Sequence, residues 1–189
     1  KVARRTLHPA EILRELPGYD PDVAKSRAKA RAIMEAKGFG PDKRIKIKMS
    51  TRNIPTYRDS AIILIDQLKE IYIDADLEIV ETALWVPKLV RREYQFALSQ
   101  VGNGVDDPDQ NYPENYACGS RTYMDYCDKE VDALIAKQSA ERDPARRKEI
   151  AWEIDKKLTR DAVRPMIYYL RGGTCWRPAV RNMTIMGNS

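Results

Sequence analysis

Apolar and polar residues alternate in three segments of this chain, and the alternation predicts strands. Residues 44–50 read RIKIKMS, a period of two that is typical of a half-buried strand. The same pattern predicts a second strand at residues 76–81 and a third at residues 94–100. The residues expected on the inner faces of these strands are Ile45, Ile47 and Met49, then Leu77 and Ile79, and finally Tyr94, Phe96 and Leu98.

A helical period separates the first two strands. Between residues 57 and 71 the apolar residues recur every three or four positions and fall on one helical face. These residues are Ala61, Leu64, Ile65, Leu68 and Ile71. A strand, a helix and a strand in this order predict a parallel pair joined by a right-handed crossover. With a short helix around residues 87–92 before the third strand, the expected fold class is α/β, a mixed sheet with flanking helices.

Aspartate followed by proline marks the beginning of an expected helix near the N-terminus. Asp20-Pro21 predicts a helix that runs to Lys37, with aspartate as the N-cap and proline at the first helical position. Gly38 then supplies the C-terminal stop, because glycine readily adopts the left-handed conformation that ends many helices.

Two more helices are expected in the second half of the chain. Asp128 caps a helix from residue 129 to about residue 140, and Asp143-Pro144 opens a longer one. The residues that share the apolar face of the longer helix are Ile150, Ala151, Ile154 and Leu158. Residues 166–170 form a strand candidate, and an irregular, partly extended tail is expected after them.

The charge pattern does not favour nucleic acid as a partner. The chain has 33 Lys and Arg against 28 Asp and Glu, and the net charge of +5 is spread over interspersed signs. The basic residues at 25–37 scatter around their helix instead of forming one stripe, so we expect a solvated face. No apolar run approaches the roughly 20 residues of a membrane helix, and no secretory signal is present in the chain.

A polar and aromatic loop follows the third strand, and the sequence places the recognition chemistry there. We call residues 101–118 the recognition segment. Its side chains Asp106, Asp107, Asp109 and Asn111 carry oxygen ligands at a spacing that would suit calcium. The calcium pattern lacks a glycine at the turn position and a glutamate at the twelfth place, so a hydrogen-bonded turn built on Asp107-Pro108 is favoured.

No catalytic or cofactor site is expected. A pair of loop carboxylates is conceivable as a glycosidase site, but acidic loop residues are usually solvated or capping. His8 is the one histidine in the chain, so a histidine-based triad or a zinc site has no support. We therefore expect no metal ion and no cofactor.

The cysteines favour one disulfide. Cys118 and Cys127 enclose eight residues between a loop and a helix cap, a feasible span for a bridge in an oxidising compartment. Two thiols that flank a mobile loop are the alternative. Cys175 is left over in either case.

Five segments in the same order resemble the C-terminal part of a family 5 solute-binding protein, the peptide and nickel receptor type of ABC importers. They are residues 16–25 (LPGYDPDVAK), 67–79 (QLKEIYIDADLEI), the aspartate-proline pair at 107–108, 126–135 (YCDKEVDALI), and 143–148 (DPARRK) followed by 163–167 (VRPMI). Each motif alone is weak, but together they cover nearly the whole chain.

The resemblance implies a fold and a function. Residues 1–165 would form the ligand-binding lobe of a two-lobed, type II-like periplasmic binding protein, and residues 166–189 would return to pack on the missing lobe. Such receptors enclose a peptide-like or other small solute by hinge closure and deliver it to an ABC permease in the inner membrane. The chain would then belong to a periplasmic, monomeric binding protein and not to an enzyme. The alternatives are a scaffold without a transport ligand, or a receptor for oligosaccharides, opines or metal chelates.

Two positions depart from the family pattern. Tyr72 stands where relatives commonly have glycine, at an expected left-handed position where a bulky residue costs about 1 kcal/mol or more. Gly104 stands four residues before Pro108, where peptide receptors of the family place an aspartate that holds the α-amino group of the peptide. A desolvated ammonium would lack its main partner there unless Asp106 replaced it, so free peptide recognition is in doubt.

The expected ligand contacts are aromatic and polar residues near the recognition segment. They are Trp85, Asn103, Asp106 and Tyr116, with Arg121 and Tyr123 as second choices. Each has a structural alternative: Trp85 could belong to the core, Tyr116 could pack on the loop, and Arg121 could be solvated. Trp152 and Trp176 are expected to pack against a helix or the tail.

Overall fold

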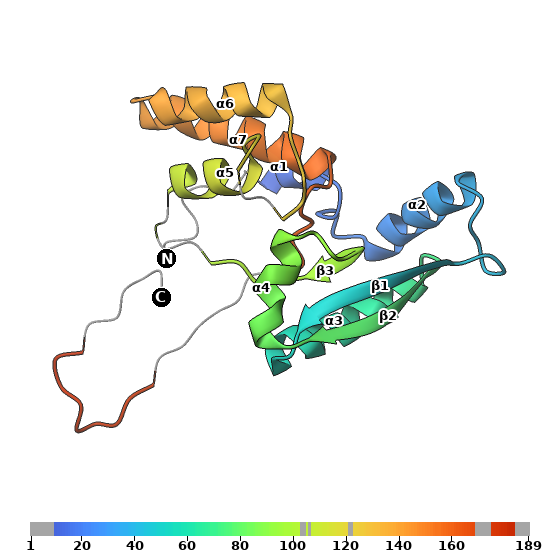
Figure 1. Cartoon of the computed structure of the whole chain (residues 1–189). Coiled ribbons are helices and arrows are strands. Elements are labelled where there is room, and N and C mark those ends of the chain that lie inside the picture. Colours follow the sequence, from blue (N-terminus) through green and yellow to red (C-terminus); the bar gives the residue numbers. More distant parts are fainter. Residues whose placement is uncertain (1–9, 103–104, 106, 121–122, 169–174, 184–189) are drawn as a thin grey trace. The chain divides into compact units, whose positions relative to one another are not determined.

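The chain forms two compact units. The computed structural model describes residues 10–102, 105, 107–120, 123–168 and 175–183 (Figure 1). Residues 18–101 belong to one unit, which we call the sheet unit, and the chain on either side of it belongs to the other, which we call the helical unit. Each unit is described by itself.

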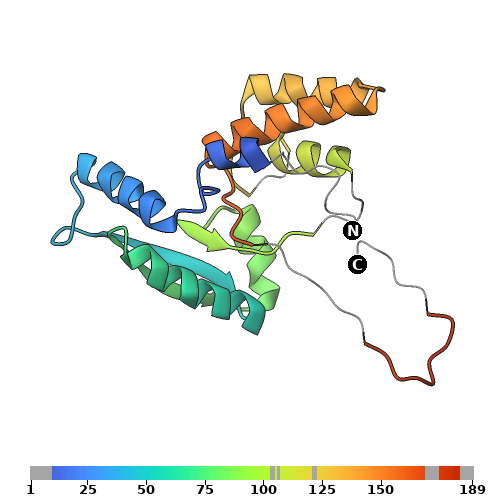
Figure 2. The ribbon, with the colours of Figure 1, turned by 180° about the vertical axis from the view of Figure 1, so that it is seen from behind.

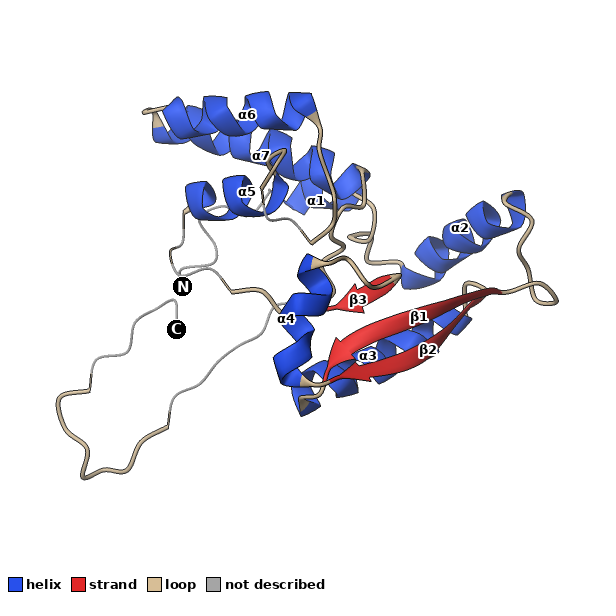
Figure 3. Cartoon of the chain, in the orientation of Figure 1, coloured by secondary structure: helices blue, strands red, loops and turns tan. Residues whose placement is uncertain are grey.

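A parallel sheet organises the sheet unit. Its strands are β1 (Ile45–Arg52), β2 (Ile73–Val80) and β3 (Phe96–Leu98), in the spatial order β2-β1-β3. Both neighbours run parallel to β1 (Figure 3). Met49 lies opposite Leu77 on β2 and opposite Phe96 on β3. The α/β fold class is confirmed, and so is the parallel pairing of the first two strands.

Two helices cover the two faces of this sheet. Figures 1 and 2 show α3 (Pro55–Lys69) on one face and α4 (Thr82–Val90) on the other. On α3 the predicted apolar face is confirmed: Ala61 is fully buried, and Leu64, Ile65 and Leu68 are partly buried. Ile71, which is also partly buried, lies two residues after the end of the helix. Ile79, which was predicted to face inward, is 45% exposed. The prediction failed because β2 is an edge strand in the described sheet, which leaves Ile79 with a strand neighbour on one side only.

Helix α4 begins earlier than predicted. It starts at Thr82 instead of near Pro87, which lies inside the helix. Trp85 and Leu89 are spaced by four residues, and both are only 3% exposed. This apolar pair lies on one side of the helix and sets its position, because residues four apart share a helical face.

Helix α2 (Val23–Ala36) begins two residues after the predicted start. Its N-cap is Asp22, whose carboxylate accepts from the Lys25 backbone N–H at 2.9 Å. Asp20 instead accepts from the Asp22 N–H at 2.9 Å and stabilises the turn before the helix. Gly38 has a φ of 80°, so the predicted C-terminal stop is confirmed.

Tyr72 connects α3 to β2 in the left-handed conformation that its position predicts. Its φ is 65°. The hydroxyl donates to the Glu35 carboxylate of α2 at 2.9 Å. Tyrosine therefore contributes an interaction across the unit in exchange for backbone strain that glycine would avoid.

Four helices form the described part of the helical unit: α1 (Ala10–Glu15), α5 (Pro108–Tyr116), α6 (Lys129–Ala140) and α7 (Pro144–Arg160). The bounds of α6 and the beginning of α7 are as predicted, and Asp128 and Asp143 cap these helices through their side chains. The two helices pack side by side (Figures 1 and 2). The buried cluster between them consists of Val131, Ile135, Ile150, Ile154 and Leu158.

The tail differs from its prediction. Residues 166–168, the described part of the strand candidate, have no regular structure and are exposed. A strand needs a neighbour for its backbone hydrogen bonds, and no described strand pairs with this segment. Trp176 is 48% exposed, so its predicted packing is wrong, whereas Trp152 is partly buried with the Lys148 ammonium 4.8 Å from its ring centroid. Within the described residues no helix has the length and apolar character needed to cross a membrane.

Candidate functional site

The carboxyl edge of the sheet is the first place where a small molecule could be bound. The chain reaches β2 from β1 through α3 and then returns through α4 to β3 on the other side of β1. In open α/β sheets, ligands bind outside the carboxyl ends of the strands at the point where the strand order reverses. Here that point lies between β1 and β3.

Polar groups gather at this edge. Asn53 follows β1 and donates its amide to the Glu81 carboxylate at 2.8 Å. Arg52 donates to the Thr82 hydroxyl at 3.2 Å. Gln100 follows β3, and its amide nitrogen is buried without a hydrogen-bond partner among the described residues. The sequence did not single out Gln100, whose only signal was its place at the end of the predicted third strand. A buried donor without a partner costs free energy, so a polar ligand group there would be stabilising.

A partly buried ion pair joins β2 to α4. The Ser50 hydroxyl donates to the Glu78 carboxylate, and the Lys88 ammonium of α4 lies 3.1 Å from the same carboxylate. The hydrogen bond from Ser50 and the charge of Lys88 lower the pKa of Glu78. Because Ser50 is fully buried and Lys88 comes from α4, these contacts hold α4 on the sheet.

The recognition segment contains a helix, which corrects the prediction of a loop. Helix α5 begins directly after Asp107, whose side chain accepts from the Asp109 backbone N–H at 2.9 Å. Pro108 occupies the first helical position, and Gln110 the third. Aspartate followed by proline is the signal that correctly predicted the beginning of α7, and the glutamine at the third position of α5 strengthens it. The signal was present in the sequence, but the aspartates were interpreted as a turn.

Arg147 of α7 binds the aspartates at the beginning of α5. Its two terminal nitrogens lie 2.6 and 3.1 Å from the oxygens of Asp107, and one of them lies 2.9 Å from Asp109. The hydrogen bonds from Arg147 and from the Asp109 N–H hold the pKa of the Asp107 carboxyl below its ordinary value. Asp109 also accepts from the Ser139 hydroxyl of α6 at 2.6 Å. These carboxylates therefore join three helices.

The described residues show no cluster of side chains suited to bind a metal ion. No group of three or more histidine, cysteine or acidic side chains is arranged to hold a metal ion within the described residues. Asp107 and Asp109, which the calcium hypothesis used, are instead bound by a guanidinium group.

Tyrosines of α5 face the helix pair. The Tyr112 hydroxyl donates to the Ala151 carbonyl at 3.1 Å. Tyr116 packs against the buried cluster, and burial raises the pKa of its hydroxyl. The Arg164 guanidinium lies 5.7 Å from the Tyr116 ring centroid and donates to Asn115 at 3.3 Å. Tyr116 thus has the packing role that the sequence left open beside ligand contact.

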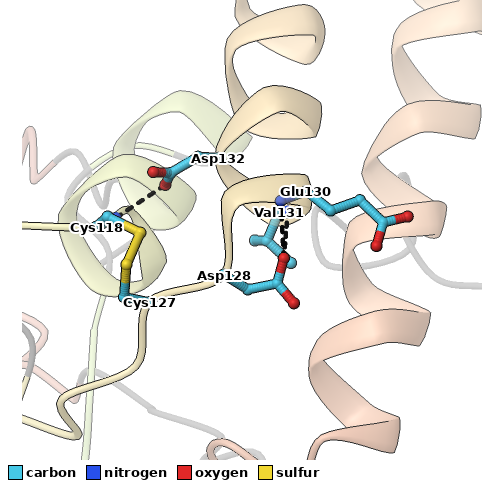
Figure 4. The surroundings of a disulfide bond; sticks show 6 residues. All are labelled: Cys118, Cys127, Asp128, Glu130, Val131 and Asp132. Carbon is cyan, nitrogen blue, oxygen red and sulfur yellow. Dashed lines mark hydrogen bonds between the residues drawn. A yellow bond between two sulfur atoms is a disulfide. The ribbon is translucent and has the colours of Figure 1, made fainter.

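A disulfide joins the end of α5 to the beginning of α6 (Figure 4). Cys118 and Cys127 are bonded, with their Cα atoms 4.5 Å apart, in the pairing that the sequence favoured. The Cys118 N–H donates to Asp132 at 2.8 Å (Figure 4). Asp128 accepts from the N–H groups of Glu130 and Val131 at 2.8 and 3.1 Å. Cys175 is free and exposed.

The six expected ligand contacts fall in different environments. Trp85 is buried in the sheet unit, which leaves little of its surface open to a ligand. Tyr116 and Tyr123 are partly buried residues of the helical unit, near the disulfide in sequence. Asn103, Asp106 and Arg121 lie outside the described residues.

A family model matches most of the chain. Its description is bacterial extracellular solute-binding proteins, family 5 Middle, and it matches residues 3–123. No curated protein matches the chain.

Solved structures share the fold. OppA of Burkholderia pseudomallei is 17% identical with a TM-score of 0.71, over 78% of this chain and 29% of that one. The ABC transporter substrate binding protein CtaP of Listeria monocytogenes is 26% identical with a TM-score of 0.63, over 79% of this chain and 30% of that one. NikA of Staphylococcus aureus, solved with Ni(L-His)2, is 22% identical with a TM-score of 0.64, over 72% and 30%. The matched part of this chain thus covers less than a third of the length of each of these proteins.

Proposed function

Because the chain belongs to the bacterial extracellular solute-binding proteins of family 5, we propose that it forms part of the solute receptor of an ABC importer. The match over residues 3–123 carries this proposal. In such a receptor a periplasmic, monomeric protein captures a small solute between two lobes and presents it to the permease in the inner membrane. The work is done by binding and hinge closure, so no catalytic step is proposed.

The same proposal assigns the two parts of this chain to different lobes of the receptor. Residues 1–165 would contribute to one lobe of the cleft, and residues 166–189 would pass to the other lobe. The exposed side chains of Met166, Ile167 and Trp176 support this, because apolar groups of this size are usually covered in a complete protein.

The proposed ligand class depends on Gly104. Related structures hold the peptide RPPGFSPFR, in OppA of Haemophilus influenzae, and Ni(L-His)2, in NikA. Gly104 offers no carboxylate to a peptide ammonium group. We therefore expect a ligand whose bound end carries no free ammonium, such as a blocked peptide, an opine, a sugar or a metal chelate. Asn103, Asp106, Arg121 and Tyr123 stay predicted contacts. In the sheet unit, Gln100 is a separate candidate contact, because its amide nitrogen has no hydrogen-bond partner among the described residues.

Thermal unfolding of the full-length protein tests this proposal. The additives are trialanine, N-acetyltrialanine, an opine, an oligosaccharide and the nickel–histidine complex. A ligand present at 100 times its dissociation constant stabilises the bound protein by about 2.7 kcal/mol, which is readily measured. We expect stabilisation by an additive without a free ammonium group. Stabilisation by trialanine alone would contradict the role assigned to Gly104, and no stabilisation at all would favour a scaffold that has lost its ligand.

A further inference from the structure

Gln138 of α6 is fully buried although its side chain is polar. Its amide nitrogen donates to the Asp109 carboxylate of α5 at 3.2 Å. This bond fixes the orientation of the amide, because the opposite orientation would place the amide oxygen against a carboxylate, which only accepts. The oxygen of Gln138 is therefore left for a second partner, and it has none among the described residues. A buried acceptor without a donor costs free energy.

Arg147 of α7 supplies the complementary group in the same cluster. Its two terminal nitrogens bind Asp107, and one of them also lies 2.9 Å from Asp109. The third nitrogen, Nε, is buried and has no hydrogen-bond partner among the described residues. This nitrogen is a donor, because the guanidinium group stays protonated. Since Gln138 and Arg147 both bind Asp109, the unpaired acceptor and the unpaired donor belong to side chains that meet at one carboxylate.

The charges of this cluster decide what kind of molecule could join the two groups. A cation is disfavoured, because the positively charged guanidinium group lies there and its N–H cannot bind one. An anion is disfavoured by the carboxylates of Asp107 and Asp109 and by the acceptor oxygen of Gln138. A small neutral molecule that both accepts and donates hydrogen bonds satisfies both groups.

We propose that the helical unit binds one water molecule between Gln138 and Arg147, beside Asp109. The water accepts from Arg147 Nε and donates to Gln138 Oε1, and its other hydrogen is then available to the Asp109 carboxylate. The two protein atoms have no direct bond to each other, and water commonly bridges polar groups that face each other beyond hydrogen-bond distance. Buried water typically makes about three hydrogen bonds to polar groups that the protein leaves unpaired. The site does not depend on the proposed transport function.

A crystal structure of the full-length protein, at a resolution that shows ordered water, tests the position. We expect a water molecule within hydrogen-bond distance of both Gln138 Oε1 and Arg147 Nε. A direct bond from either atom to another protein group, or a water that contacts only one of the two atoms, would overturn the proposal.

Magnetic relaxation dispersion of the water signal tests the site in solution, because it counts water molecules that stay bound for long times. Gln138→Leu removes the acceptor, and Gln67→Leu makes the same change at an exposed position of α3. We expect Gln138→Leu to hold about one long-lived water molecule fewer than the wild type, and Gln67→Leu to hold the same number. An unchanged number in a folded Gln138→Leu protein would contradict the proposal. Should this variant not fold, the crystal structure decides alone.

Discussion

At the scale of single residues, Tyr72 is a position where a side chain and the backbone conformation oppose each other. Its φ of 65° costs an L-residue about 1 kcal/mol, a cost that glycine does not have. We predict that Tyr72→Gly is more stable than Tyr72→Ala by about 1 kcal/mol, because both lose the bond to Glu35 but only glycine relieves the strain. Urea unfolding measures the difference. At Asp66, on the exposed side of α3, the glycine variant should instead be less stable than the alanine variant, because this backbone is helical.

A second prediction at the residue scale concerns the charge of Asp107. Asp107→Asn keeps the N-cap, since asparagine caps helices equally well, but removes the ion pair with Arg147. The pKa of Asp107 is lowered in the folded protein, so its stabilisation is complete above the ordinary pKa of 3.8 and is lost as the pH falls through the folded pKa. At pH 7, Asp107→Asn should therefore unfold at a lower urea concentration than the wild type. This difference between the two midpoints should disappear below pH 3.8. An equal gap at both pH values would contradict this assignment. Asp143→Asn, at the N-cap of α7, is the control. At pH 7 it should lower the free energy of unfolding less than Asp107→Asn does.

These residues also show what a sequence can and cannot reveal locally. Asp107, Pro108 and Gln110 together signal the beginning of α5, and this signal favours a helix over a turn. The partner of Asp107 was not visible, because Arg147 is 40 residues away and any of several basic residues in that region could have been chosen. Pairing of that kind is decided by packing.

At the scale of elements, the disulfide acts on the junction of α5 and α6. It closes a loop with a sequence separation of 9, which removes conformational freedom from the unfolded chain worth about 2 to 3 kcal/mol. We predict that replacing Cys118 and Cys127 together by serine lowers the free energy of unfolding by that amount. Cys175→Ser is the control and should have no measurable effect, since this thiol is exposed and unbonded. Equal stability of the double variant and the wild type would show that the junction is held by its helix packing alone.

The elements that were predicted correctly carry two signals that agree. Helices α6 and α7 have both a capping aspartate and an apolar face, and the bounds of α6 and the beginning of α7 were right. Strand β2 begins at Ile73 and not at residue 76, because Ile73 pairs with Ile45 of β1 and the register extends the strand. A register between strands is not written in either strand alone. For the same reason the residues of the sheet edge, Gln100 among them, could not be gathered into a site from the sequence.

At the scale of the whole molecule, the proposed receptor requires more chain than these 189 residues provide. Small-molecule sites bury most of the ligand surface, and a cleft between two lobes divides that burial between them. We predict that the isolated chain binds N-acetyltrialanine, trialanine or the nickel–histidine complex at least about a hundredfold more weakly than the full-length protein, because the loss of half the contacts removes about 3 kcal/mol or more. Titration calorimetry on both proteins measures the ratio, with circular dichroism to show that the isolated chain is folded. Equal affinities would mean that one lobe suffices for recognition, and hinge closure would then serve delivery to the permease and not capture.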